Sequence, residues 1–478
     1  MSNPCPHTAC GGCSMTGMPY DEQLVHKHAH LKSLLSAYGA VLPPIGMADP
    51  YHYRNKVTRT FASVRTDRKQ FAAVSGTYAA ETRRVIPIDA CAIEDLGAQK
   101  ILQTLTALCV KLKIRPFDPR SGQGVLRHAQ IRVGAATGEY LLTLVTASPQ
   151  FPGRGNLVTA LRHAHPELTS VVHNVNGFDT GMILGDERRS GHENRVLFGP
   201  GFIRDTLCGL SYRISPQSFY QVNPRGTEIL YQTAIALADL RPTDTLLDAY
   251  CGIGTIGLTA AAHCGRVIGV ELNPDAVSDA IANAKHNRIT NARFYRGDAG
   301  KFLSEHADLT PDVLIMDPPR GGSDLPFLGA VCKRKPKKVV YISCGPDTLA
   351  RDLKTLTKEY RVETIQPVDM FPMTEHCETV CLLSKLNAKQ HIEINLDMDE
   401  LDLTDAEKKA TYQEIKDYVL EHSGLKVSSL YIAQVKQQCG IIERENYNKP
   451  KSEDAKQPQC PPDKEKAIKE ALKHFGMI

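Results

Sequence analysis

The sequence contains no long apolar run. No window approaches the roughly 18 consecutive apolar residues that a membrane-spanning helix needs, so we expect no membrane association. The first residues, MSNPCPHTACGGCSM, also lack the basic start and the apolar stretch of a secretory signal. These absences predict a cytoplasmic protein in which thiols stay reduced. The 14 cysteines are therefore not expected to form a disulfide framework, and their clustering near the start favours metal binding or catalysis.

The chain also lacks a large excess of charge of one sign, but its charges are unevenly spread. The formal net charge is +4. Residues 51–70 carry six basic side chains against one acid, whereas residues 393–421 carry ten acids against three lysines. The basic stretch YHYRNKVTRTF also contains aromatic residues, a mixture that favours nucleic acid, and Arg54 and Lys56 are candidate phosphate contacts. The acidic stretch is typical of a solvated surface that repels phosphate.

Three regions follow one another along the chain. Residues 1–212 mix cysteines, basic loops and alternating strand-like segments, which predicts an α+β domain that is mostly sheet. Residues 213–386 alternate short apolar runs with helical stretches, which predicts parallel strands joined by crossover helices in a Rossmann-like, doubly wound α/β sheet. Residues 387–478 predict a small helical domain. Thr404 and Glu407 form a capping box there, and further helices are expected around SSLYIAQVKQQ and DKEKAIKEALKHF.

A glycine-rich loop follows the first of the apolar runs in the α/β region. Gly252, Gly254 and Gly257 form G-x-G-x-x-G between the strand TLLDAY and a helix. Glycines at these positions permit a tight turn and let a ligand come close to the backbone and to the helix N-terminus. The motif alone fits NAD as well as S-adenosylmethionine.

Acidic residues stand at the ends of successive predicted strands. They are Asp248, Glu271, Asp298 and Asp317. Several carboxylates suit a cationic sulfonium cofactor that also carries a charged amino group, and they suit a pyrophosphate badly. Any one of these acids could be an exposed loop residue, but together they favour S-adenosylmethionine.

Five ordered motifs resemble those of a known family. They are SFYQVNP (218–224), LLDAYCGIGTIGL (246–258), DPPRGG (317–322), YISCGPDTLARDL (341–353) and DMFPMTEHCETVCLL (369–383). From Cys5 to about Lys385 the sequence resembles the RNA uracil-5-methyltransferases, which use S-adenosylmethionine and, in the ribosomal RNA branch, carry an iron–sulfur cluster. The resemblance implies five cofactor contacts: Gln221, Tyr250, Glu271, Asp317 and, near the adenine, Asp298.

The same resemblance implies that Cys344 is a nucleophile and Glu378 a base. C5 of uracil is a poor nucleophile, so a thiolate must first add to C6 and give C5 carbanion character. A base must then remove the C5 proton, and burial can raise the pKa of a carboxylate toward the range that this task needs. A lone cysteine is more often a core residue, but Cys344 follows a strand end where ligands bind in such sheets, with Asp317 on the preceding strand.

The N-terminal cysteines have the spacing of metal ligands. Cys5, Cys10 and Cys13 follow the pattern C-x4-C-x2-C, and three thiolates need a fourth ligand to close a site. By chemistry alone, four cysteines could hold zinc or a 4Fe–4S cluster. The resemblance supplies Cys91 as the fourth ligand and favours the cluster, in a structural or RNA-positioning role.

The leading functional hypothesis is a monomeric enzyme that forms 5-methyluridine in 23S ribosomal RNA. The target base must leave its stack, at a cost of about a few kcal/mol that is smallest in single-stranded loops. Methylation of transfer RNA is an alternative against which the cluster cysteines speak. A ribosome-assembly factor that binds RNA and an NAD-dependent oxidoreductase are two further alternatives. The oxidoreductase would leave Cys344 and Glu378 without a joint role.

The chain departs from the family pattern at both ends. Many members begin with a small RNA-binding β-barrel domain, and a cysteine motif that starts at Cys5 leaves no room for one. RNA would then have to be held elsewhere. Residues 387–478 lie outside the resemblance, and SGLKVSSLYIAQVKQQ has the shape of part of a helix-turn-helix. This shape motivates the hypothesis that the tail adds RNA affinity, although a small accessory domain is the simpler reading.

Overall fold

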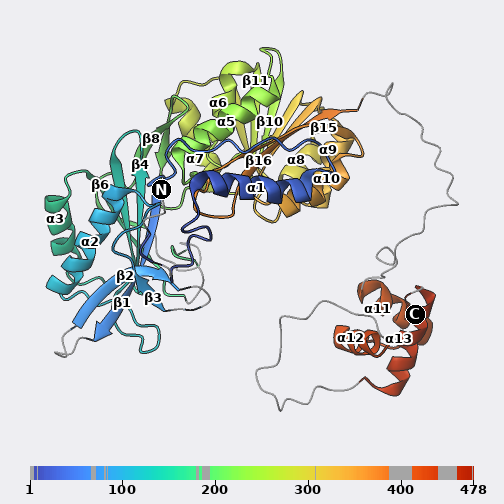
Figure 1. The fold of residues 1–478 in the computed structure, drawn as a ribbon, viewed down its shortest axis with the longest axis horizontal. Helices are drawn as coiled ribbons and strands as arrows, with labels where there is room; N and C mark the ends of the chain where they lie inside the picture. The colour runs from blue at the N-terminus through green and yellow to red at the C-terminus, as the bar shows by residue number, and fades with distance from the viewer. Residues whose placement is uncertain are drawn as a thin grey trace. The chain divides into compact units, whose positions relative to one another are not determined.

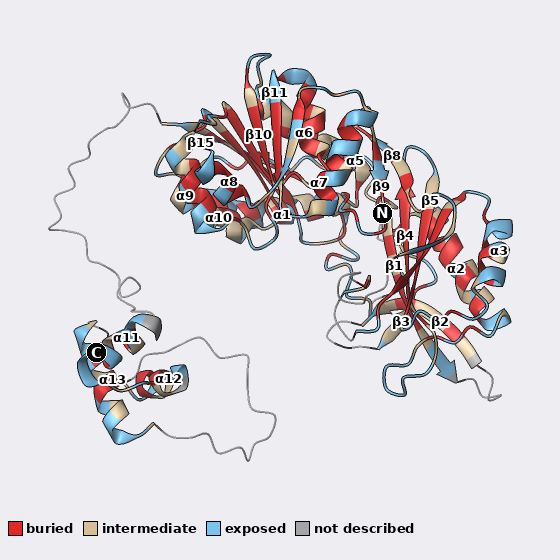
Figure 2. Ribbon diagram, turned by 180° about the vertical axis from the view of Figure 1, so that it is seen from behind, coloured by how far each residue is buried: buried red, intermediate tan, exposed pale blue. Residues whose placement is uncertain are grey.

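The chain folds into two compact units, Met1–Gln390 and His391–Ile478 (Figure 1). The computed structural model describes residues 5–7, 9–65, 71–79, 82, 84–178, 182–185, 194–306, 308–386, 412–439, 460–475 and 477. None of the helices in these ranges is both long and apolar enough to cross a membrane. In the larger unit the buried residues gather where strands and helices face each other, and in the smaller unit they gather between its described helices (Figure 2).

The first sheet of the larger unit has, within the described ranges, seven strands in the order β3-β2-β1-β4-β5-β6-β7. Its strands are β1 (Lys56–Arg65), β2 (Phe71–Tyr78), β3 (Val85–Pro87), β4 (Leu126–Gly134), β5 (Glu139–Thr146), β6 (Leu168–Val175) and β7 (Arg195–Phe198). Neighbouring strands are antiparallel except β5 and β6, which run parallel because a helix connects them. Helices α2 (Leu96–Lys111) and α3 (Arg154–Ala164) share one hydrophobic core with this sheet.

The second sheet has seven described strands in the order β12-β11-β10-β13-β14-β16-β15. These are β10 (Thr245–Ala249), β11 (Arg266–Glu271), β12 (Ala292–Arg296), β13 (Val313–Met316), β14 (Lys338–Ser343), β15 (Tyr360–Val368) and β16 (Glu378–Lys385). The first five run parallel, which confirms the predicted doubly wound α/β sheet. The run ETVCLLSK forms β16, which is antiparallel to both neighbours because no crossover helix separates it from β15.

Helices cover both faces of the second sheet because apolar side chains alternate along its strands. Leu246 packs with α5, α6 and α7, whereas Leu247 packs on the opposite face with α8, α9 and α10. The helices are α5 (Pro224–Ala238), α6 (Thr255–Ala260), η1 (Ala261–His263), α7 (Pro274–His286), α8 (Ala299–Glu305), α9 (Leu325–Arg334) and α10 (Pro346–Leu356). A hairpin of β8 (Ile203–Leu207) and β9 (Leu210–Ile214) joins the core on the Leu246 face.

The N-terminal helix α1 (Tyr20–Leu35) packs on the second sheet rather than on the first. Leu31 and Leu35 are buried in the same core as Leu247, and α1 lies along α10 (Figure 1). The following chain continues along this sheet, where Val41 bridges to Ile365. Residues 20–45 therefore pack with the second sheet, although the predicted boundary at residue 212 assigns them to the other domain.

The smaller unit contains three described helices: α11 (Tyr412–Ser423), α12 (Ser429–Gln438) and α13 (Pro462–His474). Ile415, Ile432 and Ile468, one from each helix, meet in its core. Ser428 caps α12 by accepting a hydrogen bond from the backbone N–H of Tyr431 at 3.3 Å. The predicted capping box, Thr404 with Glu407, lies outside the described residues.

Candidate functional site

One large cleft in the larger unit collects the residues that the sequence singled out. Its volume is about 1630 Å³, and side chains from both sheets line it. The lining includes all seven predicted catalytic and cofactor residues: Gln221, Tyr250, Glu271, Asp298, Asp317, Cys344 and Glu378. The parallel strands end at the same edge of the second sheet, which explains how residues more than a hundred positions apart meet there.

The glycine-rich loop turns sharply at the end of β10. Gly252 and Gly254 have φ values of 54° and 82°, which lie in the left-handed region that favours glycine. A Cβ atom at Gly257 would lie 2.7 Å from Oδ2 of Asp248, which accepts a hydrogen bond from the Gly257 N–H at 2.8 Å. Asp248 is buried, and its hydrogen bond to Gly257 holds the glycine-rich loop in place.

Two of the predicted cofactor acids also organise the backbone. Glu271, at the end of β11, accepts hydrogen bonds from the N–H groups of Gly252 at 3.1 Å and Asn273 at 2.8 Å. Asp298 caps α8 by accepting from the N–H of Lys301 at 2.9 Å. A carboxylate has about four acceptor positions, so these bonds leave both acids able to bind a ligand.

Tyr250 and Gln221 approach the cleft from two different loops. The Tyr250 ring packs edge-on against Phe327 with centroids 5.3 Å apart, and its hydroxyl donates to Ser323 Oγ at 3.4 Å. The backbone oxygen of Gln221 accepts a hydrogen bond from Asn55 Nδ2 at 3.1 Å. Asn55 thus ties the start of the first sheet to the loop that carries Gln221.

Cys344 and Glu378 are brought together by the antiparallel pairing of β14 and β16. Ser343 pairs with Thr379, so the next step of the register places Cys344 beside Glu378. Cys344 follows β14 directly and precedes α10, which begins at Pro346. Glu378 is 4% exposed, and its Oε2 has no hydrogen-bond partner among the described residues. A carboxyl group and a thiol therefore share one corner of the cleft.

Burial and like charges keep both groups protonated. The pKa of Cys344 is raised to about 11 by burial and by the charges of Glu378 and Asp317. The pKa of Glu378 is raised by burial and by the charge of Asp317, and burial also raises the pKa of Asp317. Without a bound ligand, this corner of the cleft therefore suppresses its own negative charge.

Sequence reasoning gave no role to Arg320, although it lies in the DPPRGG motif. Arg320 lines the cleft, and its charge opposes the rise in pKa of both Cys344 and Glu378. Arg320 is thus a cation that acts on both candidate catalytic groups. Its position three residues after Asp317, at the same strand end, was the available signal.

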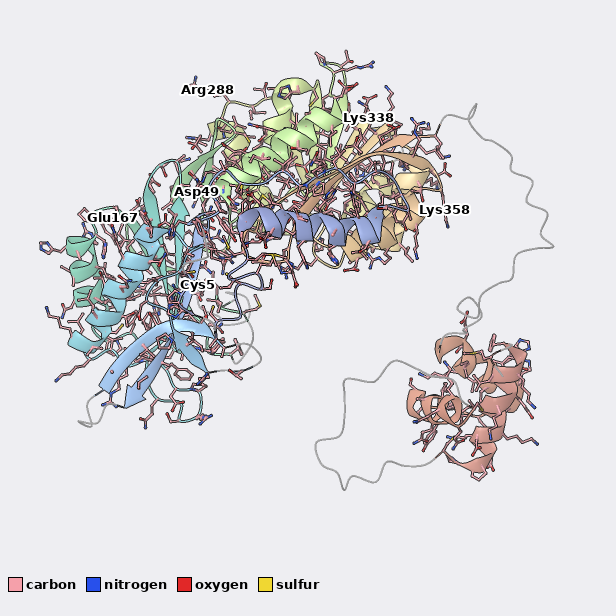
Figure 3. All side chains as sticks on the ribbon, in the orientation of Figure 1. Cys5, Asp49, Glu167, Arg288, Lys338 and Lys358 are labelled. Atoms are coloured by element: carbon pink, nitrogen blue, oxygen red, sulfur yellow. The ribbon has the colours of Figure 1, made fainter. Side chains whose placement is uncertain are left out.

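The four N-terminal cysteines are close enough for their charges to interact. The pKa of Cys13 is raised to about 12 by burial and by the charges of Cys91, Cys5 and Cys10. Cys13 and Cys91 both pack against Met373, and Cys5 is labelled among the side chains in Figure 3. Among the described residues, no group of three or more histidines, cysteines or acids has the geometry to hold a metal ion. The four thiols therefore lie near one another, but their arrangement in this structure is not that of a metal site.

Basic residues line the side of the cleft that the first sheet contributes. Arg54, Lys56 and Arg132 all line it. The pKa of Lys56 is lowered to about 8 by burial and by the charges of Arg132 and Arg54. Arg59 belongs to the same basic stretch but is buried in an ion pair with Glu94, so it is not available to a ligand.

Comparisons with known proteins agree with this site. Residues 189–386 match the family model for tRNA (Uracil-5-)-methyltransferase. A protein from Halalkalibacterium halodurans, named an uncharacterized RNA methyltransferase, is 39% identical over 393 residues that cover 80% of this chain and 83% of that protein. One of the same description from Listeria innocua is 38% identical over 389 residues, with 80% and 83% covered.

A solved structure is similar over most of its length. The Pyrococcus abyssi tRNA (uracil-54, C5)-methyltransferase, crystallised with S-adenosyl-L-homocysteine, has a TM-score of 0.64 and 26% identity to this chain. The match covers 79% of this chain and 86% of that chain. From the family model and the relatives, the chain belongs to the RNA uracil-5-methyltransferase family.

Proposed function

We propose that this enzyme uses S-adenosylmethionine to methylate C5 of a uridine in 23S ribosomal RNA through a covalent bond between Cys344 and C6. The observation that carries the proposal is that Cys344 and Glu378 lie together in the cleft: each is next to the last pair of β14 and β16, Ser343 with Thr379, and the charge of Glu378 acts on the Cys344 thiol. A nucleophile and a base that act on neighbouring carbons of one ring must themselves be neighbours.

The acidic edge of the second sheet suits the cofactor. Gln221, Tyr250, Glu271, Asp298 and Asp317 would hold it. Bound there, S-adenosylmethionine supplies a methyl group on a positively charged sulfur, and the nearby carboxylates offset that charge. The tight glycine turn leaves the backbone open to close approach. The same positive charge would lower the pKa of the Cys344 thiol, which like charges raise in the free protein.

Cys344 and Glu378 would act in sequence. The Cys344 thiolate forms a bond to C6, and the electron pair of the C5–C6 double bond makes C5 the nucleophile that takes up the methyl group. Glu378 then accepts the proton of C5. The electrons of the broken C–H bond restore the C5–C6 double bond, the C6–S bond breaks, and Cys344 leaves as a thiolate.

The basic side of the cleft would receive the RNA backbone. Arg54 and Lys56 would offer positive charge to the space in which a flipped uridine would lie, whereas Arg132 is buried and donates to the backbone oxygen of Ser218. Lys56 bears the like charge of its neighbours, which a phosphate would relieve. A folded RNA would thus bind through its phosphates on one side while its base reaches Cys344 on the other.

A 4Fe–4S cluster on Cys5, Cys10, Cys13 and Cys91 is part of the same proposal. The proximity of Cys5, Cys10 and Cys91 to Cys13, whose pKa their charges raise, supports it, and four thiolates would complete the coordination of a cluster. The cluster would order the N-terminal segment. Iron and acid-labile sulfide measured in anaerobically purified protein should both be lost in Cys13→Ser, whereas zinc in their place would contradict the cluster.

Transfer RNA is the second candidate substrate. The similar solved structure and the family model both have names that refer to tRNA. Purified enzyme given 23S ribosomal RNA and tRNA in parallel, followed by mass spectrometry of the digested RNA, separates the two. Methyl transfer to 23S RNA alone supports the proposal, and transfer to tRNA alone overturns its substrate.

A trapping experiment tests the mechanism. RNA with 5-fluorouridine at the target has no proton for the base to remove, so the enzyme should remain bonded to it through Cys344. Cys344→Ala should form no such adduct. Cys332→Ala is the matched control, because Cys332 is a half-buried cysteine at a distance from the cleft lining. Wild-type enzyme that binds this RNA and cofactor without forming the bond would refute the mechanism.

A further inference from the structure

We propose that an N-terminal arm, residues 13–27, together with Tyr53, positions the loop that leads into Glu378 and so controls the proton-removal step. This inference rests on the proposed function. The loop, residues 369–377, is called the base loop. It connects β15 to β16 and ends at the residue before Glu378.

The arm and Tyr53 make hydrogen bonds to successive residues of the base loop. Lys27 Nζ donates to Asp369 Oδ1 at 2.7 Å and to the Phe371 oxygen at 3.1 Å, and the Tyr53 hydroxyl donates to the Pro372 oxygen at 3.0 Å. At Met373 the N–H donates to Gln23 Oε1 at 2.8 Å, and the carbonyl oxygen accepts from the Met15 N–H at 3.0 Å. The Glu375 N–H donates to Ser14 Oγ at 3.0 Å. Segments more than 300 residues apart in sequence are thus joined along the whole loop.

The base loop needs such support because its backbone is strained. Met373 has a φ value of 70°, a backbone conformation that residues other than glycine rarely adopt. Met373 is 1% exposed, and both its N–H and its carbonyl oxygen bond to the arm. A strained residue persists when its surroundings fix it, so the arm holds the loop in this conformation.

Glu378 depends on the loop for its position. Its Oε2 has no hydrogen-bond partner among the described residues, so side-chain bonding there does not fix the carboxylate. Glu378 is the first residue of β16 and pairs with Val368, the last residue of β15, so the base loop runs between these two paired residues and its conformation bears on the direction of the Glu378 side chain. Gln23 and Tyr53 are therefore positioning residues, which act on the reaction through the loop.

The cysteine site bears on the same loop. Cys13 is the first residue of the arm, and Cys13 and Cys91 pack against Met373 together with Tyr53 and Ile93. A group that binds Cys13 would fix the arm next to Ser14 and Met15, the residues that bond the loop. Loss of that group should therefore impair proton removal more than the earlier steps.

The test separates bond formation by Cys344 from proton removal by Glu378. The variants are Tyr53→Phe, Gln23→Leu and the double variant. Adduct formation with 5-fluorouridine RNA reports the first step, because C5 carries no proton there. Tritium release from RNA labelled at C5 of uridine, measured in a single turnover with bound cofactor, reports the second. Tyr38→Phe is the matched control, since the Tyr38 hydroxyl also donates to a carbonyl oxygen, that of Ala350 at 2.8 Å, away from the base loop.

We expect the double variant to release tritium at least about tenfold more slowly, while adduct formation stays within about twofold of wild type. Deuterium at C5 should then slow the double variant more than wild type, because proton removal has become limiting. Tyr38→Phe should match wild type in both assays. Cys13→Ser should show the same separation of the two steps.

Equal losses in both assays, or unchanged tritium release, would overturn the inference. If the double variant does not fold, as judged by its thermal unfolding, Tyr53→Phe alone decides, because it removes one hydroxyl and keeps the ring. Wild-type enzyme that forms no adduct would instead contradict the proposed function, so the two failures are distinguishable.

Discussion

The two sides of the cleft carry opposite charge, and each side is crowded with charges of its own sign. On the second sheet, burial and then the charges of Glu378 and Asp317 raise the pKa of Cys344, and burial and then the charge of Asp317 raise that of Glu378. On the first sheet, burial and then the charges of Arg132 and Arg54 lower the pKa of Lys56. Groups whose charged forms burial and like neighbours disfavour in the free protein are stabilised in those charged forms when an opposite charge binds between them. The comparison teaches that one side is built for a cation and the other for a polyanion.

The largest expected effect is the loss of the nucleophile. Cys344→Ala should lower single-turnover methylation by roughly 10³-fold or more, because C5 then has no route to carbanion character. Methyl transfer from radiolabelled cofactor measures this. Cofactor and RNA should still bind, since the charges on both sides of the cleft are unchanged. Methylation that persists near the wild-type rate would remove Cys344 from the chemistry.

The raised pKa of Glu378 should affect how the methylation rate depends on pH. Glu378 accepts a proton only when ionised, and its raised pKa means that it is still largely protonated where an ordinary carboxyl group, with a pKa of 4.5, is not. Single-turnover rates should therefore keep rising above about pH 6, by up to about tenfold per pH unit. Glu378→Gln should be slow and should lose this rise. A wild-type rate that is flat from about pH 5 upward would contradict a base with a raised pKa.

Removal of one acid should weaken cofactor binding and leave RNA binding unchanged. Asp317→Asn removes a carboxylate from the second-sheet side, and we expect affinity for S-adenosylmethionine to fall about tenfold. Calorimetry with cofactor and filter binding with RNA give the two affinities. RNA affinity that falls as much as cofactor affinity would mean that the two sides of the cleft do not act separately.

The positive charge of the cofactor should lower the pKa of the Cys344 thiol. S-adenosylmethionine carries a positive sulfur that S-adenosylhomocysteine lacks, so the first should lower the pKa of the thiol more than the second. Alkylation of Cys344 by iodoacetamide, followed by mass spectrometry, should be several-fold faster with S-adenosylmethionine, since one pKa unit is worth about tenfold in thiolate. Equal rates with the two compounds would show that the cation does not act on the thiol.

The smallest expected effect concerns the basic side. Lys56→Met should weaken RNA binding a few-fold and reduce the slope of log affinity against log salt by about one. Cofactor affinity should not change. A salt slope equal to that of wild type would remove Lys56 from the phosphate contacts and leave Arg54 as the candidate.

Local patterns predicted the parts of this molecule that depend on neighbouring residues. The glycine turn after β10 and the acids at successive strand ends follow from short motifs, because parallel strands place their ends at one edge. The cleft also brings Cys344 and Glu378 together, but the sequence gave no geometric reason for this. Their contact depends on the antiparallel insertion of β16, whereas the sequence grouped that run with the parallel strands.

Long-range pairings account for what the sequence did not show. Arg59 reads as a free cation in its basic stretch, yet Glu94 pairs with it inside the protein. The arm around Gln23 meets the base loop around Met373 across 350 positions of the chain. Neither partner carries a local signal for the other, because a buried hydrogen bond depends on the assembled fold rather than on spacing in the sequence.

The place of β16 in the sheet has a consequence for how little the enzyme must move. Residues opposite each other on antiparallel strands have Cα atoms about 4.5–5.5 Å apart, a separation that the backbone ladder maintains. Cys344 and Glu378 stand at the end of such a ladder, between β14 and β16. C5 and C6 are adjacent atoms of a flat ring, so two side chains held at this separation by the sheet can act on the two atoms one after the other. If Cys344 and Glu378 act as proposed, the RNA must bring its base to this pair of groups.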